Sequence, residues 1–201
     1  LLLYISIPRK KAKFYGFSAT TPEIPYAKKI SRWVNGKTII GGAHATLLPE
    51  DCLSSFDFTV IGEGEEAIVQ ILSGQNTYRV VVGDRIKDLD SIPFPAWDKI
   101  EEPFSDSLFP GEKYGLSEPA ASLISSRGCP FHCAFCANIY WLPVVHRSVD
   151  NIIGEFKALM KRGIRYFRFE DDNVAIHPEF PYLANEIQKF HISYKCHIRS
   201  D

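Results

Sequence analysis

Short apolar runs alternate with helical stretches through the first part of the chain. Three runs, 15–20, 37–40 and 58–61, are rich in β-branched and aromatic residues and predict strands. Helices are predicted at 23–33 and between residues 62 and 72. Because strands and helices alternate at short intervals, this pattern predicts a parallel α/β sheet.

A change of composition separates this part from the rest of the chain. Residues 76–88 predict a small hairpin with its turn at Gly83-Asp84. Prolines recur from 89 to 119 and predict an extended linker. We therefore divide the chain into a first domain at 1–88, a linker at 89–119 and a second domain at 120–201.

The second domain repeats the alternation of strands and helices. Strands are predicted at 122–126, 164–169 and 193–198, and a second helix at 180–190. The first helix begins at Ser148, a good N-cap, and its core-facing stripe is formed by Ile152, Ile153, Phe156 and Leu159. These steps predict the first half of a parallel (β/α) barrel, with its catalytic groups at the carboxyl ends of the strands.

Composition and charge indicate the class of protein and its location in the cell. Hydrophobic residues make up 45% and charged residues 23% of the 201 residues, as in ordinary globular proteins. The net charge of −1 gives no field that would attract nucleic acid. The apolar start 1–7 precedes the basic run 9–11, which is the reverse of a signal peptide, and is too short to span a membrane. We expect a cytoplasmic protein and, since residue 1 is not Met, a fragment truncated at both ends.

The strongest chemical signal is the stretch Arg127–Cys136, which carries cysteines 129, 133 and 136. Thiolates are the ligands of iron–sulfur clusters, and three of them leave one iron of a cubane open. The five cysteines are too few and too clustered for a disulfide framework and indicate a reducing compartment. The alternatives are a redox pair or a zinc knuckle, but zinc would need a fourth ligand, and His132 lies inside the turn.

This stretch resembles the cluster loop of the radical SAM superfamily, whose signature is Cys-x3-Cys-x-aromatic-Cys. The resemblance implies that Cys129, Cys133 and Cys136 hold a [4Fe–4S] cluster and that Phe135 lies against the adenine of S-adenosylmethionine. In that family the open iron chelates S-adenosylmethionine, which is cleaved to a 5′-deoxyadenosyl radical. Glu170, Asp171 and Asp172 follow the second predicted strand, and the resemblance implies that they bind its ammonium group; a helix-capping acidic turn is the alternative.

Small residues follow each predicted strand of the first domain, at the edge where open α/β sheets bind ligands. Ser18-Ala19-Thr20 and Gly41-Gly42 resemble two signatures of the cobalamin-binding Rossmann-like domain. That resemblance implies cobalamin contacts from Ser18, Thr20, Gly41, Gly42, His44, Gly62, Glu63, Gly64 and Glu65. Tight strand-to-helix turns, and helix capping by the histidine and the two glutamates, are the alternatives.

Four further residues are weaker candidates. Arg199 and Asp201 follow the third strand of the second domain, where they are placed to contact substrate or cofactor. Cys196 and Cys52 are interpreted as small core residues.

Together the resemblances imply a class B, cobalamin-dependent radical SAM methyltransferase. It would transfer a methyl group to an unactivated carbon of a small-molecule or natural-product substrate, with flavodoxin or ferredoxin as electron donor. A radical SAM oxidative cyclase, a methylthiotransferase-like enzyme and a non-catalytic iron–sulfur or cobalamin-binding module remain open. We expect the three-strand segment to be inactive by itself.

Overall fold

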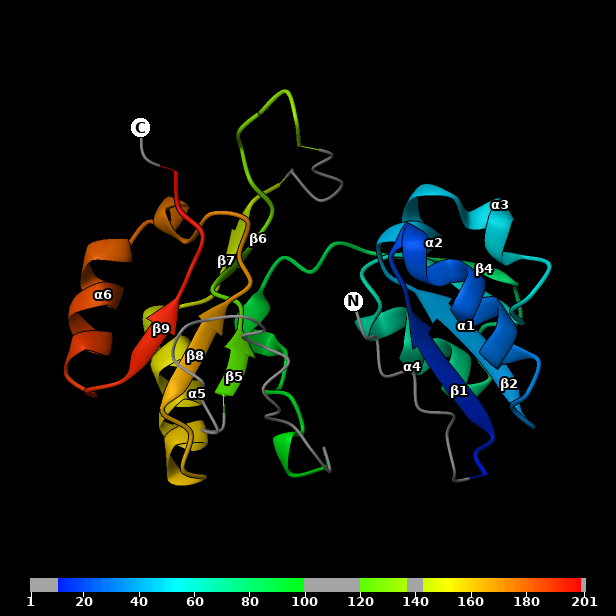
Figure 1. Ribbon diagram of the computed structural model, residues 1–201, viewed down its shortest axis with the longest axis horizontal. Helices are drawn as coiled ribbons and strands as arrows, with labels where there is room; N and C mark the ends of the chain where they lie inside the picture. Colours follow the sequence, from blue (N-terminus) through cyan, green and yellow to red (C-terminus); the bar gives the residue numbers. More distant parts are fainter. Residues whose placement is uncertain (1–10, 100–119, 137–142, 200–201) are drawn as a thin grey trace. The chain divides into compact units, whose positions relative to one another are not determined.

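The computed structural model describes residues 11–99, 120–136 and 143–199. The chain divides into two compact units, Leu1–Ile86 and Lys87–Asp201 (Figure 1). Each unit contains a parallel sheet with helices packed on it, so the predicted α/β fold class is confirmed. No helix in these described ranges is both long and apolar enough to cross a membrane.

From residue 11 onward, the sheet of the first unit has four parallel strands in chain order: β1 Phe14–Ser18, β2 Lys37–Gly41, β3 Phe58–Gly62 and β4 Val80–Gly83. The predicted hairpin at 76–88 is wrong, because β4 runs parallel to β3 along its free edge. This pairing completes the hydrogen bonds of β3 and buries Val81.

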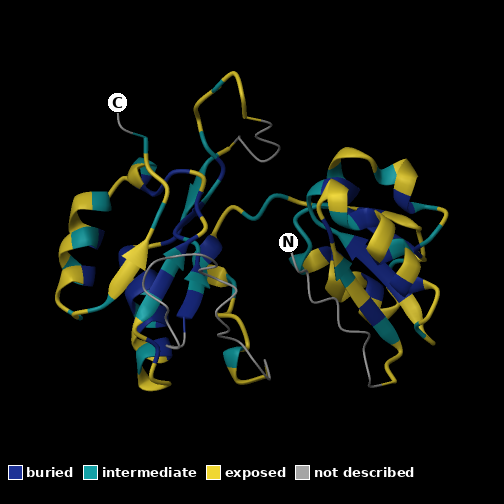
Figure 2. Cartoon of the chain, viewed as in Figure 1, coloured by how far each residue is buried: buried dark blue, intermediate teal, exposed yellow. Residues whose placement is uncertain are grey.

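Helices cover both faces of this sheet. One face is covered by α1 Ile24–Ser31 with its preceding 3-10 turn η1 Thr21–Glu23, and by α2 Ala43–Leu47 and α3 Pro49–Cys52. The other face is covered by α4 Glu65–Ser73. Successive strand residues point to opposite faces, so Ile40 packs with α1 to α3 and Ile39 packs with α4. The strand interiors are accordingly buried (Figure 2).

The described residues of the second unit form two sheets. Its parallel sheet has the order β5 Ala120–Leu123, β8 Tyr166–Phe169 and β9 Ser193–Lys195. A separate antiparallel ribbon joins β6 Ser126–Arg127 to β7 Val145–His146. The predicted strand 122–126 is therefore interrupted after Leu123, and its last residue belongs to the ribbon.

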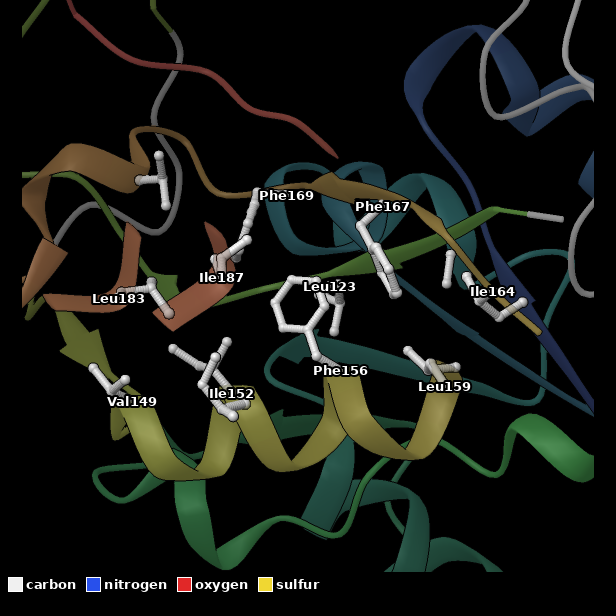
Figure 3. Packing of buried hydrophobic residues seen from close by; sticks show 13 residues of the cluster. Leu123, Val149, Ile152, Phe156, Leu159, Ile164, Phe167, Phe169, Leu183 and Ile187 are labelled. Carbon is white, nitrogen blue, oxygen red and sulfur yellow. The ribbon is translucent and has the colours of Figure 1, made fainter. Parts of the chain in front are cut away.

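The core of the second unit lies between its sheet and the helices α5 Val149–Lys161 and α6 Phe180–Gln188. The predicted cap and stripe of α5 are confirmed: Ser148 Oγ accepts from the Asn151 amide, and the stripe is buried. In Figure 3, Ile152, Phe156 and Leu159 point from α5 toward side chains of the sheet. The centroids of the Phe156 and Phe167 rings lie 4.5 Å apart.

Part of the predicted linker is packed onto α5. Its described part contains the 3-10 turns η2 Leu89–Ser91 and η3 Trp97–Lys99; η5 Val174–Ile176 lies later in the same unit. Asp90 accepts from the Ser148 amide at 3.0 Å, and the indole of Trp97 donates to Glu155 at 3.2 Å. Residues 89–99 are therefore a structural part of the second unit.

Candidate functional site

The three-cysteine loop is held at its root by the β6–β7 ribbon. Ser126 and Arg127 pair with His146 and Val145, so both ends of the intervening segment are fixed to each other. Gly128 follows with φ +91°, a conformation that glycine adopts without the steric cost of a side chain. The loop therefore turns away from the sheet directly before Cys129.

The thiols on this loop are at least partly accessible. Cys129 and Cys133 are half-buried, Cys136 is exposed, and none forms a disulfide. The Cys136 amide donates to the Cys133 carbonyl at 2.9 Å, which closes a tight turn. No three His, Cys, Asp or Glu side chains in the described ranges lie close enough together to hold a metal ion. What fits a cluster is the donor set, three cysteine thiols on one loop that form no disulfide, together with Phe135, which is 93% exposed.

Arg199 brings a positive charge to this loop from beyond the end of β9. Its guanidinium donates to Cys133 Sγ at 3.7 Å and lies 4.0 Å from the centroid of the Phe131 ring. Asp201, the other weak candidate of this segment, lies outside the described residues.

The three predicted carboxylates follow β8, next to the end of β5. Glu170 and Asp172 are exposed, whereas Asp171 is 2% exposed. The Glu170 amide donates to the Leu123 carbonyl at 2.8 Å, and its carboxylate accepts from Ser122 Oγ at 2.9 Å. The structure thus brings the acidic run and the root of the cysteine loop to the same edge of the sheet.

A buried ion pair that the sequence analysis missed supports the other end of the ribbon. Arg147 follows β7, and its guanidinium lies 2.6 Å from the Glu155 carboxylate; the side chains are 7% and 3% exposed. The same guanidinium donates to the Ile124 carbonyl at 2.9 Å. The signal was present in the sequence, because Glu155 falls in the apolar stripe of α5, three residues after Ile152 and four before Leu159.

A groove of about 370 Å³ lies on the α4 side of the first unit's sheet. It is lined by glycines and Ser18 near the strand ends and by apolar side chains elsewhere: Phe14, Gly16, Phe17, Ser18, Ile39, Gly41, Gly42, Val60, Gly62, Gly64, Ile68 and Leu72. Ile68 and Leu72 are 42% and 48% exposed one helical turn apart. These two side chains form a partly exposed apolar wall of the groove.

The glycines of the groove have different physical roles. Gly42 has φ +90°, and an added Cβ would lie 2.8 Å from Ser18 Oγ, so the local backbone already requires glycine there. A Cβ at Gly41 would meet only Val60, at 3.8 Å or beyond, and one at Gly16 would meet nothing within 4 Å. Gly16, which the sequence analysis missed, therefore leaves room in the groove without being needed by the fold.

Four predicted cobalamin residues do not line this groove. Thr20 donates from its amide and hydroxyl to Glu23, which caps η1. His44 is 3% exposed, and its ring nitrogens lie 3.1 Å from Thr21 Oγ1 and 3.0 Å from Asp51 Oδ2.

The two glutamates lie at the start of α4. Glu63 accepts from Arg85 and from the Ile86 amide, at 2.5 and 2.7 Å. Glu65 is the first residue of the helix. Glu63 thus holds the segment after β4.

The two remaining cysteines are structural. Cys52 is fully buried in the core of the first unit, and burial raises the pKa of its thiol. Cys196 follows β9 and packs against the second core; burial first, and then the Asp171 charge, raises its pKa. Both thiols are thereby kept protonated, which disfavours metal binding.

Comparison with known protein families matches both units. Residues 6–72 match the B12 binding domain, and residues 123–200 match the radical SAM superfamily.

Among characterised relatives, the chain is 28% identical over 183 residues to cytidylyl-2-hydroxyethylphosphonate methyltransferase of Streptomyces wedmorensis, covering 68% of this chain and 34% of that protein. It is 27% identical to the anaerobic magnesium-protoporphyrin IX monomethyl ester cyclase of Rubrivivax gelatinosus, covering 83% of this chain and 35% of that protein. The chain thus spans about a third of the length of these relatives.

Solved structures share the fold. The cobalamin-dependent S-adenosylmethionine radical enzyme OxsB aligns with 89% of this chain and 28% of its own, with a TM-score of 0.62 and 14% identity. The radical S-adenosylmethionine methyltransferase TsrM from Kitasatospora setae, solved with cobalamin and a [4Fe–4S] cluster, aligns with 90% of this chain and 41% of its own, at a TM-score of 0.58 and 13% identity. With both families matched in this order, the chain belongs to the proteins that join a B12 binding domain to a radical SAM domain.

Proposed function

We propose that this chain is part of a cobalamin-dependent radical SAM methyltransferase that methylates an unactivated carbon of a small molecule. The observation that carries the proposal is that one chain contains both a loop with three cysteines that form no disulfide and a segment matching the B12 binding domain, with an apolar groove beside its glycines. Methyltransferases among the relatives favour methyl transfer. The cyclase relatives make oxidative cyclisation the second candidate.

In the second unit, Cys129, Cys133 and Cys136 would hold the [4Fe–4S] cluster. Phe135, with its exposed ring, would lie against the adenine of S-adenosylmethionine. When bound together, the cluster and S-adenosylmethionine supply a 5′-deoxyadenosyl radical. The exposed carboxylates of Glu170 and Asp172 would accept hydrogen bonds from the ammonium group, Glu170 in place of or beside its present contacts with Ser122 and Arg168.

In the first unit, the groove would receive cobalamin. A large ligand needs small residues where it enters between strands and helix, and Ser18, Gly41 and Gly42 supply that space beside Gly62 and Gly64. The exposed apolar side chains of α4 give its nucleotide tail a surface to pack on. The contacts predicted for Thr20, His44, Glu63 and Glu65 would require these side chains to change their present partners or positions.

The proposal includes the setting of the protein. The first domain extends over 1–88 and the radical SAM core over 120–201, joined by 89–119, whose described part packs on α5. A cluster that oxygen destroys, on a loop whose thiols form no disulfide, would require a reducing compartment, and we therefore propose the cytoplasm. The cluster would be reduced by an electron donor such as flavodoxin or ferredoxin.

A cobalamin titration of the full-length protein, followed by visible absorbance, tests the groove. Gly16→Leu extends a side chain into the groove from a position where an added Cβ meets no atom within 4 Å, so the variant should fold and lose binding. Gln70→Leu places the same side chain on α4 outside the groove lining and should bind normally. Gly42→Leu is expected to lose binding too, but its strained backbone makes it the less informative variant. Equal binding by the parent and Gly16→Leu would refute this site.

The cluster is tested by anaerobic reconstitution and EPR of the reduced protein. Adding S-adenosylmethionine should change the spectrum, since the fourth iron is open to it. A spectrum that does not respond to S-adenosylmethionine would favour a non-catalytic iron–sulfur or cobalamin-binding module. A separate product assay with the full-length protein distinguishes methyl transfer from cyclisation, because only methyl transfer forms a methylated product steadily.

A further inference from the structure

Asp171 makes an unusually complete set of hydrogen bonds for a residue at the edge of a sheet. Its Oδ1 accepts from the hydroxyls of Ser125 and Ser126 at 2.6 and 2.7 Å, and from the Ser126 amide at 2.6 Å. Its Oδ2 accepts from the Ser125 amide at 2.9 Å. All three residues are buried, with exposed fractions of 2% or less for Asp171 and Ser125 and 4% for Ser126.

These contacts leave Asp171 unsuited to the ligand that the acidic run was expected to bind. A carboxylate whose oxygens already accept from four donors, and which is closed off from solvent, offers nothing to an incoming ammonium group. Its neighbours Glu170 and Asp172 are exposed on either side of it. The acidic run therefore contains one internal carboxylate and two outward ones.

We propose that Asp171 is a positioning residue that clamps the root of the cysteine loop. The inference rests on the proposed function only for its consequence, that the clamp sets where the cluster ligands lie. Ser126 begins β6, so the clamp holds the strand that leads into Cys129. Through the pairing of Ser126 with His146, the same clamp fixes the end at which the loop returns.

The clamp needs the charge of Asp171 and not only its shape. Four N–H and O–H groups point at the carboxylate, and hydrogen bonds to an ionised acceptor are about twice as strong as neutral ones. In Asp171→Asn the amide group would replace one acceptor oxygen by a donor. With Oδ1 kept as the oxygen, the new NH₂ would face the Ser125 amide, donor against donor.

The test uses the full-length protein without its cofactors, followed by residue-resolved hydrogen exchange. In Asp171→Asn the amides of Ser125, Ser126 and Arg147, the last of which donates to the Ser125 carbonyl at 2.9 Å, should exchange at least about tenfold faster, which corresponds to the loss of a single charge-assisted hydrogen bond. The amides of α5 should keep their protection. The double variant Ser125→Ala, Ser126→Ala removes the two hydroxyl donors and should reproduce the change in part.

Reconstitution then separates a clamp from a ligand. A clamp predicts that Asp171→Asn and the double serine variant both lose cluster, or change its EPR spectrum before S-adenosylmethionine is added. Glu170→Gln and Asp172→Asn serve as matched controls, which should hold the cluster normally and bind S-adenosylmethionine more weakly.

Two results would overturn the clamp. The first is unchanged exchange at Ser125 and Ser126 in Asp171→Asn. The second is a variant that holds the cluster fully and loses only S-adenosylmethionine, as expected for a ligand. If the α5 amides also lose their protection in Asp171→Asn, the whole unit has unfolded. In that case, exchange at the Arg147 amide and cluster uptake in the Ser125→Ala, Ser126→Ala variant decide whether the clamp exists. If the parent protein takes up no cluster, the proposed function fails, while the exchange experiment still decides the clamp.

Discussion

Replacing Arg147 by Met should destabilise the second unit strongly. The Met side chain replaces the apolar stem of arginine, so the change removes the guanidinium and keeps most of the packing that the stem makes. The guanidinium donates to Glu155 at 2.6 Å, to Asn151 Oδ1 at 2.7 Å and to the Ile124 carbonyl at 2.9 Å. In the variant, Glu155 keeps the indole of Trp97, 3.2 Å away, as its described donor.

The expected cost follows from the burial of the partner left behind. Glu155 is 3% exposed, and breaking a buried pair by removing one charge costs about 3–5 kcal/mol, because the other charge stays uncompensated. Removing both charges should cost much less, since two desolvated groups disappear together. Arg147→Met combined with Glu155→Leu should therefore recover most of the lost stability.

Native-state hydrogen exchange at the amides of α5 measures this within the full-length protein. A cost of about 3–5 kcal/mol accelerates exchange by roughly 10²- to 10⁴-fold if these amides exchange through unfolding of the unit. As a control, Lys189→Met removes one charge from the ion pair between Lys189 and Glu186 at the end of α6. Because the lysine is 63% exposed and the glutamate 22%, this change should alter stability by about 0.5 kcal/mol or less. A cost below about 1 kcal/mol for Arg147→Met, or a double variant no more stable than the single one, would refute the reasoning.

Three further predictions concern the cysteine loop and its root. Cys133→Ala should abolish cluster uptake, whereas Cys196→Ala should leave it intact, because that thiol is packed against the core and kept protonated; iron and sulfide analysis after reconstitution checks both. Arg199→Gln removes the positive charge beside Cys133 Sγ and should make the reduction potential of the cluster more negative, and an unchanged potential in a spectroelectrochemical titration would contradict this. Burial, and then the neighbouring His177, hold the pKa of His146 below its ordinary value of 6.5 against the opposing Asp171 charge. Since the folded-state pKa lies below that of the unfolded chain, the ribbon should become less stable as the pH falls below about 6.5. Its amides should then exchange faster, after correction for the intrinsic effect of pH on exchange. The variant His146→Phe should not show this acceleration.

The sequence predicted the fold class and the elements with strong local signals. The cap at Ser148 and the stripe of α5 were confirmed, because capping and helical periodicity are local properties. The strand β4 was misread as half of a hairpin, since local sequence does not say which strand a short apolar run pairs with. Parallel pairing with β3 is a long-range contact, and tertiary structure overrode the turn signal at Gly83-Asp84.

The candidate sites were predicted as motifs but not as contacts. The glycines beside the groove were found by their resemblance to a family, whereas Gly16 and the exposed Ile68 and Leu72 were not, because they acquire meaning only when α4 lies along the sheet. His44 and Glu63 were plausible ligands by residue type. The structure gives them internal partners instead, which depend on chain segments distant in sequence.

The alternation of strand side chains explains why one carboxylate of the acidic run is buried and two are exposed. Along β8 the side chains alternate, with Phe167 and Phe169 buried and Arg168 half-exposed between them. The alternation continues past the last strand residue, so Glu170 and Asp172 point outward and Asp171 points inward. The same period of two, followed along the sequence from Phe167, is therefore a signal that assigns Asp171 to the interior. An ionised side chain can be buried there only if donors surround it, and the hydroxyls and amides of Ser125 and Ser126 meet that requirement. The pleat of one strand thus supplies both an internal anchor for the loop and an outward pair of carboxylates beside it.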